Sequence, residues 1–330
     1  MPAAVSSRRG VRPLLAVVGL AVTAGCMYFA VRGVEVDDAV QALRDSDPLW
    51  LLPGLPVFAA GIVLRGVRWW ALYDAEKRPP LRAVMYALLV GYFFNNILPA
   101  RAGEAARVIA LHSRARRTPR AEIIATVVVE RVFDMLALLL ILLCAYPWLP
   151  EISWLRNAAI LGALVTVVLA VLIVLVVRYD ARAVHWLLSP LRRIRRPGFA
   201  ERVEVAAVNA TRGLVALRSP VIAGRGFALT AASWVVLAIS YWILMEAFHL
   251  DLPLAAAILV TVAINLSLVL PSSPAALGVF EAATIIALNA FDVPHADALS
   301  YALVLHVLNL VPFLVIGAVL LGPAALRRNR

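Results

Sequence analysis

The chain has 330 residues, of which 63% are hydrophobic and only 15% are charged. A single soluble core cannot bury that much apolar surface, so the composition excludes an ordinary soluble domain and predicts a polytopic membrane protein. The formal net charge of +11 comes almost entirely from arginine, because Lys77 is the only lysine. These arginines cluster at the ends of apolar runs, where the positive-inside rule and anionic lipid headgroups account for them. That placement argues against a nucleic-acid partner.

Six apolar segments are long enough to cross a membrane. Their expected ranges, in chain order, are 13–31, 50–73, 121–146, 157–177, 226–247 and 297–321. The first apolar run continues past Cys26, which favours an uncleaved span over a signal peptide. Residues 178–218 carry nine arginines against three acidic residues and are expected to form a cytoplasmic linker on the membrane surface. Both termini are then expected on the cytoplasmic side of a bacterial inner membrane.

The segment 83–113 is apolar but breaks at Pro99–Gly103. If residues 83–98 crossed the membrane fully, the six arginines of residues 101–120 would lie outside, against the positive-inside rule. Residues 103–113 would span only about 17 Å, which is short of a hydrocarbon core of about 30 Å. We therefore expect a re-entrant hairpin that enters from the cytoplasm and returns to it.

Eight residues after this break occur a second time in the chain. Glu104–Leu111 read EAARVIAL and Glu281–Leu288 read EAATIIAL, with six of eight positions identical. Each copy follows a Leu-Pro pair and a glycine, so residues 254–289, broken at Pro271–Ala276, are expected to form a second hairpin that opens from the opposite side. Two short full spans are the alternative, because the neutral second corner gives the charge rule nothing to decide.

The predicted fold class follows from these elements. It is an all-α polytopic membrane protein with a single transmembrane domain. It contains an inverted repeat of span, re-entrant broken hairpin and span, with about six full spans and two hairpins. The repeat units are residues 50–146 and 226–321.

The first corner carries the sharpest candidate site. A proline stops the first arm, a glycine permits a tight turn, and the N-terminus of the second arm offers backbone N–H groups to an anion. Arg101 and Arg107 would add charge-assisted hydrogen bonds to a lipid phosphate. For Glu104 two interpretations stay open, a contact with the substrate or a helix cap paired with Arg107. Asn95 and Asn96 end the inward arm; both are candidates for substrate binding, and the alternative is that they cap or bridge the broken backbone rather than touch the substrate.

Three charged residues, Glu130, Arg131 and Asp134, lie in the middle of the span 121–146. Glu130 would lie about 14 Å deep at 1.5 Å per residue. Charges at that depth usually face a bundle interior or a wet cavity. Arg131 and Asp134 share a helix face, so a structural ion pair explains two of the three. A substrate or proton path and a purely structural role both stay open.

Arg65 and Arg68 come just before Trp69 and Trp70. The favoured interpretation is a pair of arginines that reach the membrane interface beside an aromatic belt. Because both lie near the expected mouth of the first hairpin, a contact with a lipid headgroup is the alternative.

The second corner mirrors the first without its arginines. Ser273, Gly278 and Glu281 are its candidate site residues. Glu281 would line a cation path, act as a counter-charge to the first corner, or simply cap its helix. His306 and Asn309 are interpreted as satisfied polar groups on an apolar segment.

Three motifs occur in order along the chain. They are GxxxNxxxPxRxGExxR at 91–107, ERxxD at 130–134 and SPxxLGxFE at 273–281. On these motifs, residues 10–322 resemble the lysylphosphatidylglycerol synthase transmembrane family, also called flippase-like membrane proteins. The second corner of that family commonly contains paired glycines. Ala275 and Ala276 stand there in this chain and leave open how tightly the corner turns.

The resemblance implies a lipid-translocating domain of the kind that is fused, in the eponymous synthases, to a soluble aminoacyl transferase. No such transferase is recognisable in these 330 residues. We therefore expect a lipid flippase or transporter and not an enzyme, with no catalytic residues, cofactor or metal. The expected partners are membrane lipids with an anionic or zwitterionic headgroup. No Gly-Lys-Ser/Thr phosphate loop is found, so ATP is not expected to drive the transport.

Two other functions are compatible with the sequence. The first is a non-transporting scaffold that binds lipid and presents it to a separate lipid- or glycan-modifying enzyme. The second is a membrane-embedded transferase that uses Glu130, Asp134 and Glu281 as acids or bases, which requires the three carboxylates to converge on one cavity.

Overall fold

A computed structural model describes most of the chain. The described residues are 21–34, 36–98, 102–151, 219–268 and 273–327, with a few residues between 156 and 171. This part is helical and contains no strand. Several predicted features lie wholly or partly outside the described residues. They are the start of the span 13–31, Pro99 and Arg101 of the first corner, most of the span 157–177, the linker 178–218 and Pro271 of the second corner.

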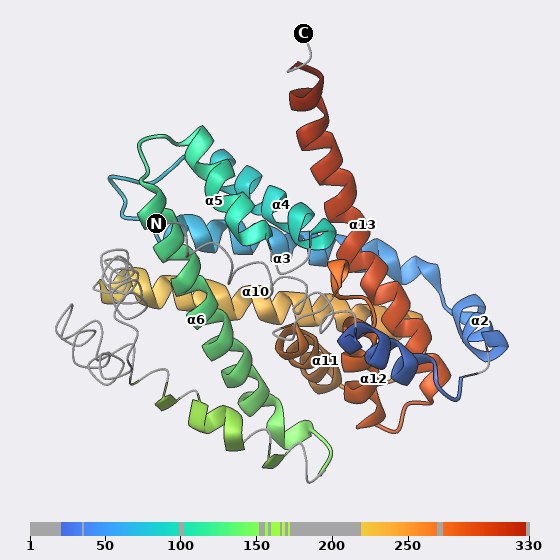
Figure 1. The fold of residues 1–330 in the computed structure, drawn as a ribbon. Coiled ribbons are helices and arrows are strands. Elements are labelled where there is room, and N and C mark those ends of the chain that lie inside the picture. Colours follow the sequence, from blue (N-terminus) through green and yellow to red (C-terminus); the bar gives the residue numbers. More distant parts are fainter. Residues whose placement is uncertain are drawn as a thin grey trace, which may run out of the picture.

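Figure 1 shows the arrangement of the helices. In chain order they are Ala21–Val31, α2 (Val36–Asp45), α3 (Leu51–Ala71), α4 (Leu81–Ile97), α5 (Gly103–Arg114), α6 (Arg120–Ala145), α10 (Pro220–Ala247), α11 (Leu254–Ser267), α12 (Val279–Asn289) and α13 (His295–Arg327). The short 3₁₀ turns are η1 (Pro48–Trp50), η3 (Tyr146–Trp148) and η5 (Pro274–Ala276).

Prolines mark where several helices begin, because proline fixes φ and needs no backbone donor there. Pro80, Pro119 and Pro253 occupy the N-cap positions of α4, α6 and α11. Pro220 opens α10 directly after the N-cap Ser219, whose hydroxyl oxygen accepts a hydrogen bond from the backbone of the first turn.

The fold is that of an all-α polytopic membrane protein. Among the described residues, three helices are long and apolar enough to cross a membrane, within Pro48–Ala71, Pro220–Ala247 and His295–Gly322. Helix α6 has a comparable length of 26 residues and carries three charges in its apolar stretch. Four of the predicted spans thus coincide with the long helices α3, α6, α10 and α13.

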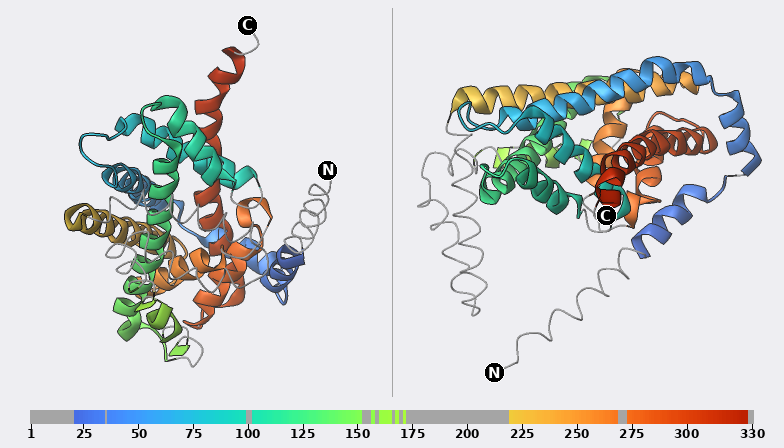
Figure 2. Two further views of the ribbon diagram at one scale, coloured as in Figure 1. Left: turned by 60° about the vertical axis from the view of Figure 1, so that its left-hand side comes forward. Right: turned by 90° about the horizontal axis from the view of Figure 1, so that it is seen from above.

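Helices α3 and α10 lie side by side and run in opposite directions, as the right-hand view of Figure 2 shows. Hydrogen bonds join the pair at both ends. At one end the Arg225 guanidinium donates to the carbonyl oxygen of Ala71 at 3.4 Å. At the other, the N–H of Asp47 donates to the carbonyl oxygen of Ala247 at 2.8 Å. This antiparallel pair gives the molecule two distinct ends.

The two broken hairpins enter from these opposite ends. Helices α4 and α5 pack together, and α4 begins just beyond the Ala71 end of α3. Helices α11 and α12 pack together at the Ala247 end, where the indole of Trp242 donates to the carbonyl oxygen of Leu252. The arms of the second hairpin have 14 and 11 residues, fewer than the roughly 20 that a helix needs to cross a membrane. The geometry therefore fits a re-entrant hairpin better than two full spans.

The tips of the two hairpins meet inside the molecule. The turn η5 of the second corner contacts α4 of the first hairpin. Helix α13 passes both, packing on α12 near its start and on α4 further along. At the second crossing Gly317 lies against the ring of Phe93, with no room for a side chain. The helix Ala21–Val31 covers the second corner, where the hydroxyl of Thr23 accepts the N–H of Ser273 at 3.1 Å.

The second corner turns tightly. At the second corner Ala275 and Ala276 each adopt φ +57°, in the left-handed region, and Gly278 has φ +77°. The corner therefore makes a glycine-like turn with alanines, at a cost on the order of 1 kcal/mol for each residue. This answers the question that the replacement of the paired glycines had left open.

Candidate functional site

A cavity of about 550 Å³ lies between the two hairpin tips. Its wall is built from α3, α4, α5, α6, α10, α11, η5, α12 and α13. This volume lies in the lower part of the range of about 300–1,000 Å³ that is usual for small-molecule sites. Charged side chains from the first half of the chain line one wall, and polar side chains of the second corner line another.

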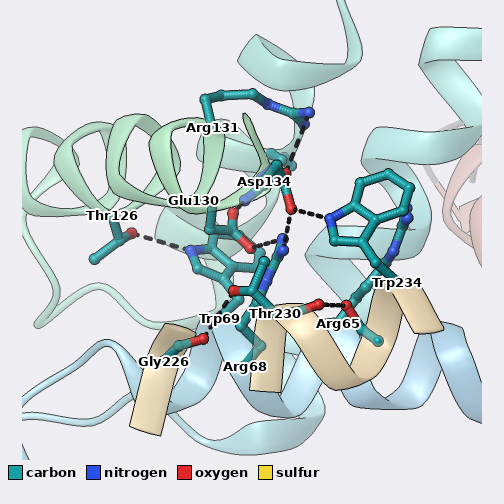
Figure 3. Close-up of polar contacts among 12 residues, drawn as sticks. Arg65, Arg68, Trp69, Thr126, Glu130, Arg131, Asp134, Gly226, Thr230 and Trp234 are labelled. Carbon is teal, nitrogen blue, oxygen red and sulfur yellow. Dashed lines mark hydrogen bonds and ion pairs between the residues drawn. The ribbon is translucent and has the colours of Figure 1, made fainter. Parts of the chain in front are cut away.

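Arg68 is the centre of the charged wall (Figure 3). It projects from α3 and is 3% exposed. Its Nη2 lies 2.7 Å from Oε1 of Glu130, and its Nη1 forms an ion pair with Asp134, so one guanidinium bridges two carboxylates of α6. The indole of Trp234 on α10 also donates to Asp134, at 2.9 Å. Arg68 does not reach the membrane interface, so the interpretation as an interfacial anchor is wrong for this residue.

Glu130 is fully buried and is shared between two arginines. Its second oxygen forms an ion pair with Arg107 of α5. The guanidinium of Arg107 also stacks over the ring of Trp69, with its Cζ 4.1 Å from the ring centroid. The indole N–H of Trp69 donates to the hydroxyl of Thr126 at 3.0 Å. Glu130 therefore joins α3, α5 and α6 and does not line the cavity.

Glu104 and Arg131 complete the cluster of charged side chains on the side of the first hairpin tip. Glu104 pairs with Arg131 across the helices α5 and α6 and with Arg107 one turn along α5, at 3.4 Å. Arg131 also lies 3.6 Å from Asp134. Glu104 thus forms the expected pair with Arg107, and it also lines the cavity. The pairing with Arg131 could not be seen from the spacing within one helix.

Backbone contact holds the two arms of the first hairpin together. A Cβ on Gly103 would collide with the carbonyl oxygen of Gly91 and with the Asn95 side chain. The N–H of Gly103 donates to Oδ1 of Asn95 at 2.9 Å. Asn95 therefore provides a hydrogen-bond acceptor for a backbone N–H in the first turn of α5, as its place at the end of the inward arm suggests.

Arg65 differs from the other arginines of the wall. Among the described residues it forms no ion pair, and its only hydrogen bond is a long one of 3.4 Å to the hydroxyl of Tyr92. Its Cζ lies 4.0 Å from the ring centroid of Trp234. Its Nε and Nη2 are buried and have no hydrogen-bond partner. Arg65 is thus a cation on the cavity wall that no carboxylate of the described residues neutralises by an ion pair.

The charges of this wall do not cancel. Four arginines, including Arg65, face three carboxylates in the cluster, which leaves one positive charge. In an apolar surrounding an unpaired cation is costly, and an anion in the cavity would offset that cost. The wall is therefore suited to a single anionic group.

The second corner contributes a carboxylate–imidazole pair. Oε1 of Glu281 lies 2.5 Å from Nδ1 of His306, and its Oε2 accepts the N–H of Gly278 at 2.7 Å. The other ring nitrogen of His306 lies 2.9 Å from the carbonyl oxygen of Ala275. One carboxylate oxygen of Glu281 caps its helix, as the capping interpretation predicts. The other oxygen contacts a residue of α13, which that interpretation does not include.

Most of the predicted site residues gather around one cavity. Those that line it are Arg65, Arg68, Asn95, Asn96, Glu104, Arg107, Arg131, Asp134 and Ser273. Glu130, Gly278 and Glu281 support it from behind. Of the three carboxylates that a transferase would need, only Asp134 lines the cavity.

Several lining residues were not predicted. Trp234, Tyr92 and Tyr241 gave no signal, because an aromatic residue in an apolar span is usually core or interface. His306 and Asn309 line the cavity as well, one helical turn apart on α13. Their i,i+3 spacing places two polar groups on one face of an apolar helix and is the signal that could have found them.

The fold and the cavity define a class of all-α polytopic membrane protein in which two opposed broken hairpins surround a charged interior site. The chain belongs to the lysylphosphatidylglycerol synthase TM region family, whose pattern matches residues 16–317. It is also 26% identical to a protein named glycosyltransferase AglD from Haloferax volcanii, over 89% of this chain and 52% of that protein. The chain thus spans about half the length of this curated relative.

Proposed function

We propose that this chain is a lipid transporter that moves a lipid with an anionic phosphate-bearing headgroup between the leaflets of a bacterial inner membrane. The family and the glycosyltransferase-named relative together suggest a membrane protein of lipid or glycan metabolism. In this proposal the chain is not itself an enzyme, and ATP does not drive it.

One observation carries the proposal: Arg65 lines a cavity between the tips of two opposed hairpins, and among the described residues no carboxylate forms an ion pair with it. A guanidinium binds phosphate oxygens through charge-assisted hydrogen bonds, and its planar fork suits that geometry. The headgroup would occupy the cavity, while the acyl chains stay in lipid. Opposed broken hairpins around an interior site are a recurrent arrangement in transporters.

The distribution of basic residues supports a cytoplasmic position for the end of α13. The loops after α3 and α5 lie at one end of the molecule, and the end of α13 packs there too, since Leu321 contacts the core around Trp69 and Ala83. Basic residues gather at this end. They are Lys77, Arg78, Arg114, Arg116, Arg117 and Arg120. By the positive-inside rule this end would face the cytoplasm.

The test is lipid movement in proteoliposomes that contain the full chain and a fluorescent phosphatidylglycerol, with dithionite reduction reporting the outer leaflet. Wild type should move the lipid faster than empty vesicles do. Arg65→Gln should slow this movement about tenfold or more, because a hydrogen bond to a charged group contributes about 1.5–3 kcal/mol. Arg65→Lys keeps the charge but not the fork, and we expect an intermediate rate.

Arg82→Gln is the matched control. Arg82 is exposed at the base of α4, away from the cavity, and its loss should leave the rate unchanged. The proposal fails if wild type moves the lipid no faster than empty vesicles, or if Arg65→Gln and Arg82→Gln are equally active.

A second candidate function is a lipid-binding scaffold that presents its ligand to a separate lipid- or glycan-modifying enzyme. The observation that favours it is the relative, which carries the name of a glycosyltransferase and is about twice as long as the matched region. This function predicts lipid binding that depends on Arg65, stoichiometric copurification of an enzyme, and no leaflet exchange by the chain alone.

A further inference from the structure

His306 lies between two hydrogen-bond acceptors. Its Nδ1 faces Oε1 of Glu281 at 2.5 Å, and its Nε2 faces the carbonyl oxygen of Ala275 at 2.9 Å. A neutral imidazole has one N–H and one bare nitrogen, whereas imidazolium has two N–H groups. With Nε2–H donated to Ala275, a neutral ring beside an ionised Glu281 would bring two lone pairs together at 2.5 Å. Both contacts are hydrogen bonds at once only if the pair holds one proton more than a neutral ring beside an ionised carboxylate.

The surroundings fix this pair in place. Glu281 is 2% exposed and His306 is 6% exposed. The N–H of Gly278 occupies the second carboxylate oxygen, and the ring of Phe280 stacks on His306 with centroids 4.4 Å apart. Among the described residues neither member of the pair forms another ion pair. The shared proton thus determines whether the pair is neutral overall or carries one negative charge.

The neighbouring elements bring few other titratable groups to the pair. Helix α10 contributes Tyr241, whose hydroxyl donates to Asn309 at 2.9 Å, and α4 contributes Tyr92. The residues from α11 and from the helix Ala21–Val31 that reach this corner are uncharged, namely Asn265 and Thr23 with Met27. The charged groups on the same cavity are Arg65, Arg68, Glu104, Arg107, Arg131 and Asp134.

We propose that Glu281 and His306 form a proton-binding site that couples proton movement to lipid movement, an inference that rests on the proposed function. His306 lines the cavity, so the proton of the pair can pass to and from water there. With the proton bound, the pair is neutral and the net charge of the cavity favours an anionic headgroup. When the proton leaves, a buried negative charge appears on the same cavity and repels that headgroup. Proton and anionic lipid are therefore bound together and released together.

The second corner transmits this change mechanically. Losing the shared proton leaves one ring N–H for two acceptors, so the contact of His306 with either Glu281 or Ala275 becomes repulsive. The ring is also bonded to Ala275, a residue held at φ +57° in the strained corner. Movement of the ring therefore pulls on the tip of the second hairpin.

Coupling of one proton to a singly charged lipid is electroneutral, and this gives a sharp signature. A pH difference across the membrane should drive accumulation of phosphatidylglycerol up to about tenfold per pH unit. A potassium diffusion potential without a pH difference should have no effect, although a net charge would gain about 2.3 kcal/mol per 100 mV.

The experiment has two arms, both on the full chain. In nanodiscs at pH 8, ¹⁵N-histidine spectra should show His306 with two N–H groups, or infrared spectra should show a protonated carboxyl that Glu281→Gln removes. His306→Gln assigns the signal among the five histidines. If His306 has one N–H at pH 8 and Glu281 is ionised, there is no proton site.

In proteoliposomes, accumulation driven by the pH difference should be lost in both His306→Gln and Glu281→Gln. The control His249→Gln, which changes an exposed histidine outside the cavity, should keep it. Wild-type lipid movement that ignores the pH difference would overturn the coupling while leaving the proposed function intact. If wild type moves no lipid under any gradient, both the proposed function and the coupling are wrong. The spectra then still test whether Glu281 and His306 bind a proton.

Discussion

The returning arms of the two hairpins carry the same short sequence, but the residues of that sequence make different contacts in the two halves. In the first, Glu104 lies among arginines and pairs with Arg131 and Arg107. In the second, Glu281 occupies the corresponding position of the repeat and contacts His306 and the backbone of its own corner. The shared features of the repeat, a broken helix and a carboxylate in the first turn of the returning arm, build the hairpin. The partners of the carboxylate distinguish the two sites.

One substitution within the repeat accounts for much of this difference. Arg107 of the first copy is replaced by Thr284 in the second. Arg107 crosses to Glu130 on α6, whereas the hydroxyl of Thr284 donates to the carbonyl oxygen of Phe280 in its own helix at 2.9 Å. The first corner is thus tied to the surrounding helices by charge, and the second by apolar packing and one carboxylate–imidazole pair. The comparison predicts that charge substitutions will destabilise the first half of the chain most.

The largest expected effect is that of Glu130→Gln. The substitution leaves Arg68 and Arg107 buried without the carboxylate that joins them. Breaking a buried pair in this way costs about 3–5 kcal/mol. We expect a corresponding loss in the free energy of unfolding, measured by denaturant titration in detergent micelles.

Glu122→Gln is the control for this prediction. Glu122 lies on the same helix α6, eight residues earlier and closer to solvent, and forms no ion pair among the described residues. Its substitution should change the free energy of unfolding by less than about 0.5 kcal/mol. Equal stabilities of the two variants would contradict the structural role of Glu130.

The sequence predicts the helices and their breaks well, but it predicts poorly which side chains contact one another. The break after Leu98, the repeat and the polar face of α6 all follow from local patterns of proline, charge and hydropathy. The role of Arg68 does not, because its partners Glu130 and Asp134 lie 62 and 66 residues away. Local spacing near Trp69 and Trp70 favoured the membrane interface instead.

The same limit applies to the contacts of the second half. Trp234 reaches Asp134 across 100 residues, and His306 reaches Glu281 across 25. Neither contact repeats a motif, and neither pair lies on one helix. Only the packing of α10 on α6 and of α13 on α12 brings these side chains together. Residues that act through such contacts have to be read from the three-dimensional structure.

Substituting the glycine at the start of each returning arm is expected to have an intermediate effect on the free energy of unfolding. In Gly103→Ala the new methyl group would meet the carbonyl oxygen of Gly91, so the arms α4 and α5 would have to separate. Overpacking of this kind costs about 1–3 kcal/mol. Gly278→Ala meets the carbonyl oxygen of Thr23 at 2.8 Å and also places alanine at φ +77°, so a similar or larger cost is expected.

Gly224→Ala is the matched control, measured by the same unfolding titration. Nothing lies within 4 Å of a Cβ at Gly224 in α10, and alanine in a helix is favoured over glycine by roughly 0.5–1 kcal/mol. This variant should therefore be as stable as wild type or slightly more stable. Destabilisation by Gly224→Ala to the extent of Gly103→Ala would show that the hairpin contact is not the cause.

The smallest effect is expected for Ala275→Gly in the second corner. Relief of the left-handed strain at φ +57° contributes about 1 kcal/mol, and the greater freedom of glycine in the unfolded chain offsets about 0.4–1 kcal/mol of it. The free energy of unfolding should therefore change by less than about 1 kcal/mol. Ala275→Val, in contrast, puts a β-branched side chain at positive φ and should destabilise clearly. If the two variants are equally stable, the strain at this corner is negligible, and the pull of His306 on the hairpin tip loses its mechanical basis.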